Sequence, residues 1–345
     1  MEADLFDLCE ASGTHETHFR VDPETGMRAI IAIHSTTLGP ALGGCRFRAY
    51  PDTTHAVQDA LRLARGMSYK AAMSGLPLGG GKAVMLYPEQ TFDRARLFTA
   101  FGRFVESLGG RYITAVDSGS SVADMDVIGA VTPHVSCTSQ GGHGDPSSHT
   151  AYGVLRAMAS AAAYRFGDPD LAGRHVAIQG VGNVGYHLAG LLHQQGAQLT
   201  VADTDNERVA RCVREFSADA VSSKDILSVD CDILAPCAMG AVLDASTVDT
   251  IRAKVIGGGA NNQLAEPEMG RILQRRGVLY IPDYVANAGG IIQIMGAYRG
   301  ESPTDTRRRL SAIYETVSSV IEYAERHHLA MSDAADQMAA AKIGE

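Results

Sequence analysis

The chain has 345 residues, enough for two domains, and its 45% hydrophobic and 20% charged residues are typical of a soluble globular protein. A net charge of −9 without a basic stripe excludes a general nucleic-acid binder, and no run of about 18 apolar residues is present to cross a membrane. The six cysteines form no CxxC pair, so we expect neither a metal site nor a disulfide framework. The N-terminal residues MEADLFDLCE are acidic where a signal peptide is basic, which predicts a cytoplasmic protein.

The first half of the chain mixes strands and helices. An apolar, β-branched run predicts a strand over 28–35, and apolar residues at helical spacing predict a helix over 54–72. The segment LPLGGGKAVMLY predicts a Gly-rich loop followed by a strand. A helix is then expected over 92–108 and a strand over 111–116.

The second half alternates strands and helices. The Gly-, Ser- and Pro-rich segment 138–148 predicts a linker, and an Ala-rich helix is expected over 150–164. The alternation beyond it is typical of a doubly wound parallel sheet, so the predicted class is α/β, and 304–341 is mostly helical. In the alternating part we expect strands at 175–180, 198–203, 231–234, 254–257 and 278–281, and helices at 186–195 and 206–216.

A GxGxxG turn lies in mid-sequence, in RHVAIQGVGNVG, where it follows a strand and opens a helix, as a dinucleotide-binding turn does. Gly180 permits the tight turn, Gly182 lets the backbone approach a diphosphate, and Gly185 lets the helix pack closely on the sheet. Asp203, about 20 residues further on, is placed to bind ribose hydroxyls and repel a 2′-phosphate, which favours NAD over NADP. Arg208 is the nearby cation that would weaken this exclusion. The alternative is a turn that binds nothing or another nucleotide.

Two lysines and an aspartate precede this turn. Lys82 follows three glycines, which would let a ligand approach the backbone and enclose the lysine. A catalytic lysine needs a pKa lowered by burial or by a second cation; Lys70 would be that cation or would bind a substrate carboxylate. Asp117, at a strand end, is a candidate for proton exchange with a substrate amine. The alternatives are surface lysines and a helix-capping aspartate. Asn261 and Asn287, beside glycine-rich segments, are candidates for carboxamide contacts with a ligand.

Further segments complete the pattern: AIIAIHSTTLGPALGGCRF (29–47), LARGMSYK (63–70), GRYITAVD (110–117), ADMDVI (123–128), TAYGV (150–154), APCAMG (235–240), GGANNQL (258–264) and PDYVANAGGIIQ (282–293). Together with LPLGGGKAV and QGVGNVG they resemble the Glu/Leu/Phe/Val amino acid dehydrogenase family, most closely its leucine and valine dehydrogenase branch. The similarity spans nearly the whole chain. The glycine–lysine stretch is specific to the family, whereas the Rossmann turn is not.

This resemblance implies a reaction and roles for the residues. Hydride transfer from Cα to NAD⁺ would be followed by hydration of the imine and collapse to a 2-oxo acid and ammonia. Lys82 would activate the attacking water, Lys70 would bind the α-carboxylate and Asp117 would assist proton transfer. Thr150 and Asn261 would help to hold the nicotinamide and the substrate.

The expected binding residues fall into two sets. For the L-amino acid substrate they are Leu42, Gly43, Gly44, Met67, Lys70, Ala115, Asn261 and Ile291. For NAD they are Thr150, Gly180, Gly182, Asn183, Val184, Gly185, Asp203, Thr204, Cys237, Ala238, Asn261 and Asn287.

The family resemblance also implies two domains with a cleft between them. Residues 1–137 would form the α/β domain for substrate binding and oligomerisation, and 138–322 the Rossmann domain that binds NAD. Helices in 323–345 would return to the first domain. Members of the family are homo-oligomers, and we expect a dimer or an octamer.

The expected substrate is an aliphatic amino acid: valine, leucine or isoleucine. Leu42, Ala115 and Ile291 are apolar at positions that resemble the family's side-chain pocket, and no cation is evident for glutamate. Departures from the branched-chain pattern keep an aromatic substrate open as an alternative. A non-catalytic NAD-binding regulator and a 2-hydroxy acid dehydrogenase are further alternatives; the latter needs a His–acid pair with an Arg. The departures are Cys45, Val116, Ser118–Ser120 and Met295–Arg299.

Overall fold

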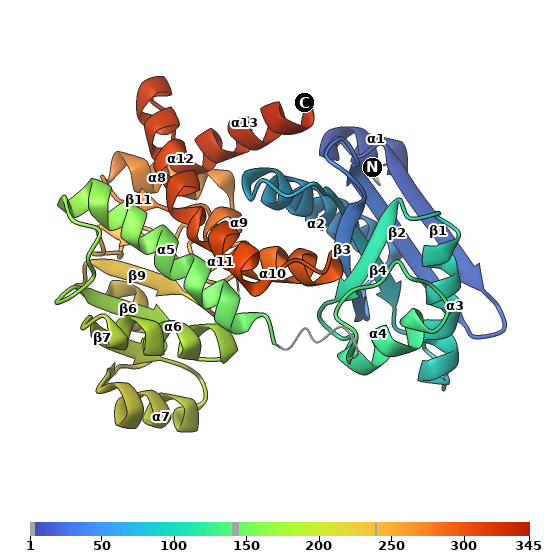
Figure 1. Cartoon of the computed structure of the whole chain (residues 1–345), viewed down its shortest axis with the longest axis horizontal. Coiled ribbons are helices and arrows are strands. Elements are labelled where there is room, and N and C mark those ends of the chain that lie inside the picture. The colour runs from blue at the N-terminus through green and yellow to red at the C-terminus, as the bar shows by residue number, and fades with distance from the viewer. Residues whose placement is uncertain (1–3, 140–144, 239) are drawn as a thin grey trace. The chain divides into compact units, whose positions relative to one another are not determined.

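The computed structural model describes residues 4–139, 145–238 and 240–345 (Figure 1). These residues divide into two compact units. The first unit contains the described residues before Asp145, together with Ala297–Gly300 and Ala339–Glu345. The second unit contains Asp145–Gly296 and Glu301–Met338. The predicted linker lies partly outside the described residues.

The first unit is a mixed sheet with helices packed on it. Its elements in chain order are α1 (Leu5–Ser12), β1 (Glu16–Asp22), β2 (Met27–Ser35), β3 (Ala41–Arg48), α2 (Thr53–Met73), β4 (Gly79–Leu86), α3 (Arg94–Glu106), β5 (Tyr112–Val116) and α4 (Val122–Gly129).

The five strands of this sheet are arranged in the order β1-β2-β4-β3-β5. Strand β2 is antiparallel to β1 and β4, whereas β3 is parallel to β4 and β5. Apolar residues of α2 pack with Ile30 and Val84, whereas α3 and α4 pack with Ile31, Phe47 and Met85. Because side chains alternate along a strand, these two clusters cover opposite faces of the sheet. The lysine-bearing strand β4 is therefore buried in the middle of the first unit.

The predicted Gly-rich loop before Lys82 is wrong, because Gly79–Gly81 already belong to strand β4. We expected these glycines to let a ligand approach the backbone, but the space beside them is filled by other parts of the chain. A Cβ at Gly79 would lie 1.8 Å from the Ser35 carbonyl oxygen, and one at Gly80 would lie 2.0 Å from the Ser68 nitrogen. The glycines thus allow a strand and helix α2 to approach the backbone of β4.

The second unit holds the doubly wound sheet. Its elements are α5 (Ser147–Phe166), β6 (His175–Gln179), α6 (Asn183–Gln194), β7 (Gln198–Ala202), α7 (Asn206–Phe216), β8 (Asp219–Ala220), β9 (Ile233–Pro236), β10 (Val255–Ile256), α8 (Pro267–Arg275), β11 (Leu279–Tyr280), α9 (Asp283–Ala286), α10 (Gly289–Tyr298), α11 (Pro303–Ser311), α12 (Ile313–His327) and α13 (Met331–Ile343), of which α10 and α13 extend into residues of the first unit.

All neighbouring strands of this second sheet are parallel, in the order β11-β10-β9-β6-β7-β8. Numbered from β6, this is the 3-2-1-4-5-6 order of the Rossmann fold, whose ligands bind at the carboxyl ends of the strands where the order reverses. The predicted α/β class with a doubly wound sheet is confirmed. The reversal lies between β6 and β9, and the GxGxxG turn follows β6 directly.

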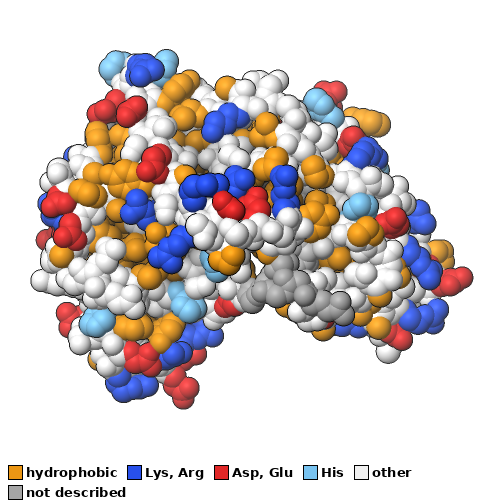
Figure 2. Space-filling view, viewed as in Figure 1, with side chains coloured by type: hydrophobic (Ala, Val, Ile, Leu, Met, Phe, Trp, Pro, Cys, Tyr) orange, Lys and Arg blue, Asp and Glu red, His pale blue; other side chains and the backbone are white. Residues whose placement is uncertain are grey.

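On the face drawn in Figure 2, acidic and basic side chains are interspersed over both units. Among the described residues, no helix is both long enough and apolar enough to cross a bilayer.

Candidate active site

Lys82 and Asp117 meet in the first unit. Lys82 lies on β4 and is only 5% exposed, and its Nζ forms an ion pair with Oδ2 of Asp117. Asp117 follows the end of β5, in a turn where its backbone N–H donates to the Ser120 hydroxyl at 2.9 Å. Strand β3 separates β4 from β5 in the sheet, and its small residue Gly44 lets the two side chains converge. A Cβ at Gly44 would lie 2.7 Å from the Asp117 Cβ.

The buried amine of Lys82 has an unusually low pKa. Burial is the main cause, the charge of Arg46 adds to it, and Lys70 acts in the same direction, so the pKa falls to about 7. Asp59 opposes the shift, and the Asp117 carboxylate in contact with the amine also favours its charged form. Cys45 contributes no charge near neutral pH, because burial raises the pKa of its thiol to about 12. Near pH 7, Lys82 can therefore accept or donate a proton, as a general acid–base group must.

Two charged residues that the sequence analysis missed extend this site. Arg46 on β3 lies between two carboxylates: its Nη1 is 2.8 Å from Oδ2 of Asp59, and its Nη2 is 3.6 Å from Oδ1 of Asp117. Asp59 lies on α2 and also accepts hydrogen bonds from Tyr50 and Arg62. Arg46 directly follows the GGC segment singled out by the resemblance, and this neighbourhood was the only sequence signal for it.

The other predicted residues of the first unit lie on the elements around Lys82. Lys70 and Met67 are half-buried on α2, and the charge of Lys70 acts on the pKa of Lys82. Leu42 is buried on β3 and pairs with Gly80 and Ile113 on the neighbouring strands. The two remaining residues, Gly43 and Ala115, are buried on β3 and β5.

The GxGxxG turn in the second unit has the shape that a diphosphate requires. Gly180 has φ +87°, and a Cβ there would lie 2.6 Å from the Cβ of Ala238. A Cβ at Gly185 would lie 2.0 Å from the Gly180 carbonyl oxygen, so helix α6 packs directly on the turn. At Gly182 the nearest atom, the Arg208 Nη1, would be at an ordinary 3.6 Å, so the surface of the turn is open.

Helix α6 begins just after Gly182 and receives no side-chain cap from the described residues. Its first N–H groups can therefore bind an anion, and the helix dipole favours one there. The turn opens on a pocket of about 310 Å³, lined by Asp145, Val181, Gly182, Asn183, Tyr186, His187, Arg208 and Arg211. Only Gly182 and Asn183 of these were predicted for the NAD site.

Asp203 follows the carboxyl end of β7. One of its oxygens accepts the N–H of Val181 at 2.8 Å, and the other accepts the N–H of Asp205 at 3.0 Å. The hydroxyl of Thr204 lies 3.4 Å from the same carboxylate. Asp203 thus fixes the position of the GxGxxG turn and places a negative charge next to it.

A second group of predicted NAD residues lies where β9 and the 257–262 segment meet. Asn287 is 4% exposed, and its side-chain nitrogen donates to Oδ1 of Asn261 at 2.8 Å. The Oδ1 of Asn287 is buried without a hydrogen-bond partner among the described residues. Cys237 accepts the N–H of Gly259, whose Cβ position is filled by Val184. A buried amide oxygen without a partner is costly, so it fits a ligand that donates a hydrogen bond.

Thr150 and Ile291 lie near the N-terminus of α10. A Cβ at Gly290 would lie 3.0 Å from the Thr150 hydroxyl oxygen, so α5 and α10 are in close contact there. Ile291 is 6% exposed. Thr150 therefore lies beside the start of α10, a helix that begins two residues after Asn287 in the sequence.

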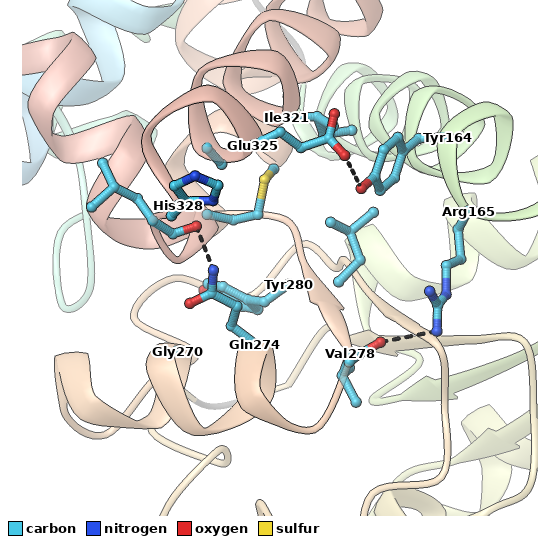
Figure 3. A pocket seen from close by; sticks show the side chains of 14 residues that line it. Tyr164, Arg165, Gly270, Gln274, Val278, Tyr280, Ile321, Glu325 and His328 are labelled. Atoms are coloured by element: carbon cyan, nitrogen blue, oxygen red, sulfur yellow. Dashed lines mark hydrogen bonds between the residues drawn. The ribbon is translucent and has the colours of Figure 1, made fainter.

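A second pocket of the second unit, of about 290 Å³, is formed by α5, α8, β11 and α12 (Figure 3). No predicted substrate or NAD residue lines it. Three of its polar side chains are paired within the lining: Tyr164 donates to Glu325, Arg165 to the Gly277 carbonyl at 3.0 Å, and Gln274 to the Leu329 carbonyl at 2.8 Å. Among the described residues that line it, none has a buried side-chain polar atom without a partner, in contrast to Asn287.

Comparison with known families identifies the family of the chain. The sequence matches the Glu/Leu/Phe/Val dehydrogenase dimerisation domain over residues 12–134, and the Glutamate/Leucine/Phenylalanine/Valine dehydrogenase domain over 141–208 and 200–345. The chain belongs to the Glu/Leu/Phe/Val dehydrogenase family. The resemblance inferred from LPLGGGKAV and the other segments is thereby confirmed.

Relatives within this dehydrogenase family are similar over nearly their whole length. Leucine dehydrogenase of Geobacillus stearothermophilus is 47% identical over 342 residues, which are 99% of this chain and 93% of the relative. Valine dehydrogenase of Streptomyces virginiae is 44% identical over 94% of this chain and 92% of its own. Among solved structures, L-tryptophan dehydrogenase from Nostoc punctiforme has a TM-score of 0.88 at 38% identity, with 98% of each chain covered.

Proposed function

We propose that this dehydrogenase uses NAD to deaminate an L-amino acid oxidatively and reversibly, giving a 2-oxo acid and ammonia. The observation that carries the proposal is the buried Lys82, with a pKa of about 7 and an ion pair to Asp117, in a chain that also has an open GxGxxG turn. Dinucleotide binding and a neutral amine base are the two requirements of this reaction.

NAD would be held by the second unit. Its diphosphate fits the N–H groups at the start of α6, and its ribose hydroxyls fit the carboxylate of Asp203. The unpaired Oδ1 of Asn287 fits a hydrogen-bond donor such as a carboxamide. When bound, NAD⁺ supplies the acceptor for the hydride that leaves Cα of the substrate.

The proton steps belong to the first unit. Lys70 would hold the substrate α-carboxylate with its charge. Neutral Lys82 would take a proton from the water whose oxygen attacks the iminium carbon, which gives a carbinolamine. The carbinolamine then loses ammonia as its hydroxyl proton leaves, and the carbonyl of the 2-oxo acid forms. Asp117 would move the proton that the nitrogen needs in order to leave.

We propose a branched-chain aliphatic amino acid as the substrate. Leu42, Ala115 and Ile291 are apolar and at least 94% buried, and none of them brings a charge that would select glutamate. The leucine and valine dehydrogenases that this chain resembles point the same way. A solved structure that is similar over 98% of the chain, at 38% identity, is a tryptophan dehydrogenase, which keeps an aromatic substrate as the second candidate.

We also propose a homo-oligomer that works in the cytoplasm, with domain bounds at 137/138 and 322/323. Strand β1 is an edge of the first sheet, and its Phe19 and Val21 are 50% and 64% exposed. An exposed apolar edge strand is a ready template for pairing with another chain. The matched family domain over 12–134, which contains β1, is described as a dimerisation domain.

Initial rates of NADH formation at alkaline pH with L-valine, L-leucine, L-phenylalanine, L-tryptophan and L-glutamate test the substrate. We expect valine or leucine to be preferred. Preference for an aromatic amino acid would keep the reaction and overturn the aliphatic assignment. An absence of activity with all five would overturn the proposed function for this substrate class.

A further inference from the structure

Arg46 contacts the Lys82–Asp117 pair from the side of helix α2. Lys82 occupies one oxygen of the Asp117 carboxylate, and Nη2 of Arg46 lies 3.6 Å from the other. Its Nη1 is held at 2.8 Å by Asp59. The side chains of Arg46, Asp59 and Asp117 are only 15–20% exposed, so their charges are weakly screened by water.

We propose that Arg46, held by Asp59, is a positioning residue that orients the Asp117 carboxylate and adds a positive charge on the same carboxylate that Lys82 contacts. This inference rests on the proposed function, in which Lys82 is the base. A planar guanidinium can hold two carboxylates in fixed directions, which a lysine at the same place cannot do. The Oδ1 of Asp117 also accepts the N–H of Ser118, so Arg46 and Ser118 fix this oxygen together. The Oδ2 of Asp117 is therefore directed at the amine of Lys82.

Asp59 is a fixed negative charge in this arrangement. Burial acts to raise its pKa, but the hydrogen bond from Tyr50 and the charge of Arg46 outweigh it, and the pKa of Asp59 is lowered. Arg62 contributes a further hydrogen bond at 3.0 Å. Asp59 therefore stays ionised near neutral pH and partly offsets the charge of Arg46.

The charged groups that face Lys82 come from three elements. They are Arg46 on β3, Asp59 and Lys70 on α2, and Asp117 after β5, together with the neutral thiol of Cys45. Arg46 and Asp59 act on the Lys82 pKa in opposite directions: the arginine lowers it and the aspartate raises it. Removing each charge should therefore shift the protonation of Lys82 in opposite directions.

The experiment measures the Lys82 pKa directly and through activity. The enzyme labelled with ¹³C-lysine is titrated by NMR, and the Lys82 signal is assigned by its loss in Lys82→Met. The same proteins give the pH dependence of kcat/KM for amino acid oxidation. The variants are Arg46→Gln, Asp59→Asn and Arg46→Lys, and Arg96→Gln, an exposed arginine of α3 outside this group, is the matched control.

We expect the Lys82 pKa to rise by about one unit in Arg46→Gln and to fall in Asp59→Asn, since one charge a few ångströms away shifts a pKa by about 1–3 units. The acidic limb of kcat/KM should move with it, to higher pH in Arg46→Gln and to lower pH in Asp59→Asn. Arg46→Lys should lie between Arg46→Gln and the wild type, and Arg96→Gln should match the wild type.

Unchanged pKa values, or shifts of the same sign in both variants, would overturn the inference. If Arg46→Gln does not fold, the Lys82 pKa in Asp59→Asn still tests the inference, because it should fall. Shifted NMR values with an unmoved activity profile would instead contradict the assignment of Lys82 as the base. The two failures are therefore distinguishable.

Discussion

The backbone of Ser68 on α2 lies directly over Gly80 on β4. A Cβ on Gly80 would stand 2.0 Å from the Ser68 nitrogen and 2.4 Å from its hydroxyl oxygen. This contact holds helix and strand together at the point where Lys70 follows Ser68 by two residues and Lys82 follows Gly80 by two. The spacing of the two lysines therefore depends on a glycine that itself has no chemical role.

Gly80→Ala should separate α2 from β4. Overpacking of a buried contact costs about 1–3 kcal/mol, and we expect a loss of that size in the free energy of unfolding together with a fall in kcat/KM. The measurement is urea denaturation. Gly66→Ala on the same helix is the matched control: a Cβ there meets no atom within 4 Å, so it should add about 0.5–1 kcal/mol. Equal stability of the two variants would contradict this account of Gly80.

Lys82→Ala should abolish turnover while NADH still binds. Loss of a general base typically lowers the rate about 100- to 10,000-fold, and the residues proposed to bind NAD lie in the second unit. Steady-state rates and the fluorescence of bound NADH measure the two properties. Near-normal turnover in the variant would remove Lys82 from the mechanism.

The stability of the enzyme should depend on pH through Lys82. Its pKa is about 7 when folded, below the ordinary value of 10.5, so between these values the unfolded chain binds one more proton there. The free energy of unfolding should therefore rise with pH in this window. Lys82→Met lacks this contribution. We expect its stability relative to the wild type to be greatest at pH 7 and to decline by pH 9.5. Urea denaturation at the two pH values measures it, and a constant difference would rule out the low pKa.

Asp203→Ala should weaken the binding of NAD⁺ more than the binding of NADP⁺, because the carboxylate that would bind the ribose hydroxyls also repels a 2′-phosphate. The loss of hydrogen bonds to a charged group suggests an increase of about tenfold or more in the KM for NAD⁺. Asp203→Asn removes the charge and keeps one oxygen, which can accept the N–H of Val181 or that of Asp205 but not both. It should therefore raise the relative use of NADP⁺ with less damage to the turn. Equal weakening of both cofactors in both variants would contradict the role of Asp203.

Elements with a strong local pattern could be predicted from the sequence. The apolar periodicity gave β2, α2 and the alternating elements of the Rossmann sheet to within a few residues. Strand β3 was missed because Gly43 and Gly44 weaken its local preference for a strand. The same reasoning misplaced Gly79–Gly81 in a loop. In both strands the glycines are required by contacts with distant backbone, which local propensity does not report.

The candidate site was predicted only in part for a similar reason. Lys82 and Asp117 could be recognised from their sequence context, because Lys82 follows a run of glycines and Asp117 follows a predicted strand. Arg46 and Asp59 look like ordinary residues of a strand and a helix, and only the packing of α2 on the sheet makes them an ion pair. For Arg46 the sequence offered only its place beside the GGC segment, and for Asp59 it offered no signal.

The groups proposed for proton transfer and those proposed for nucleotide binding lie in different units, and this separation affects how the enzyme can evolve or be engineered. The side chains proposed to move protons lie within residues 46–117, whereas those proposed to hold the nucleotide lie beyond residue 145. Substitutions that alter the coenzyme preference can therefore accumulate around Asp203 without disturbing the acid–base groups. An engineer could accordingly optimise the two properties in separate libraries and combine the best members afterwards.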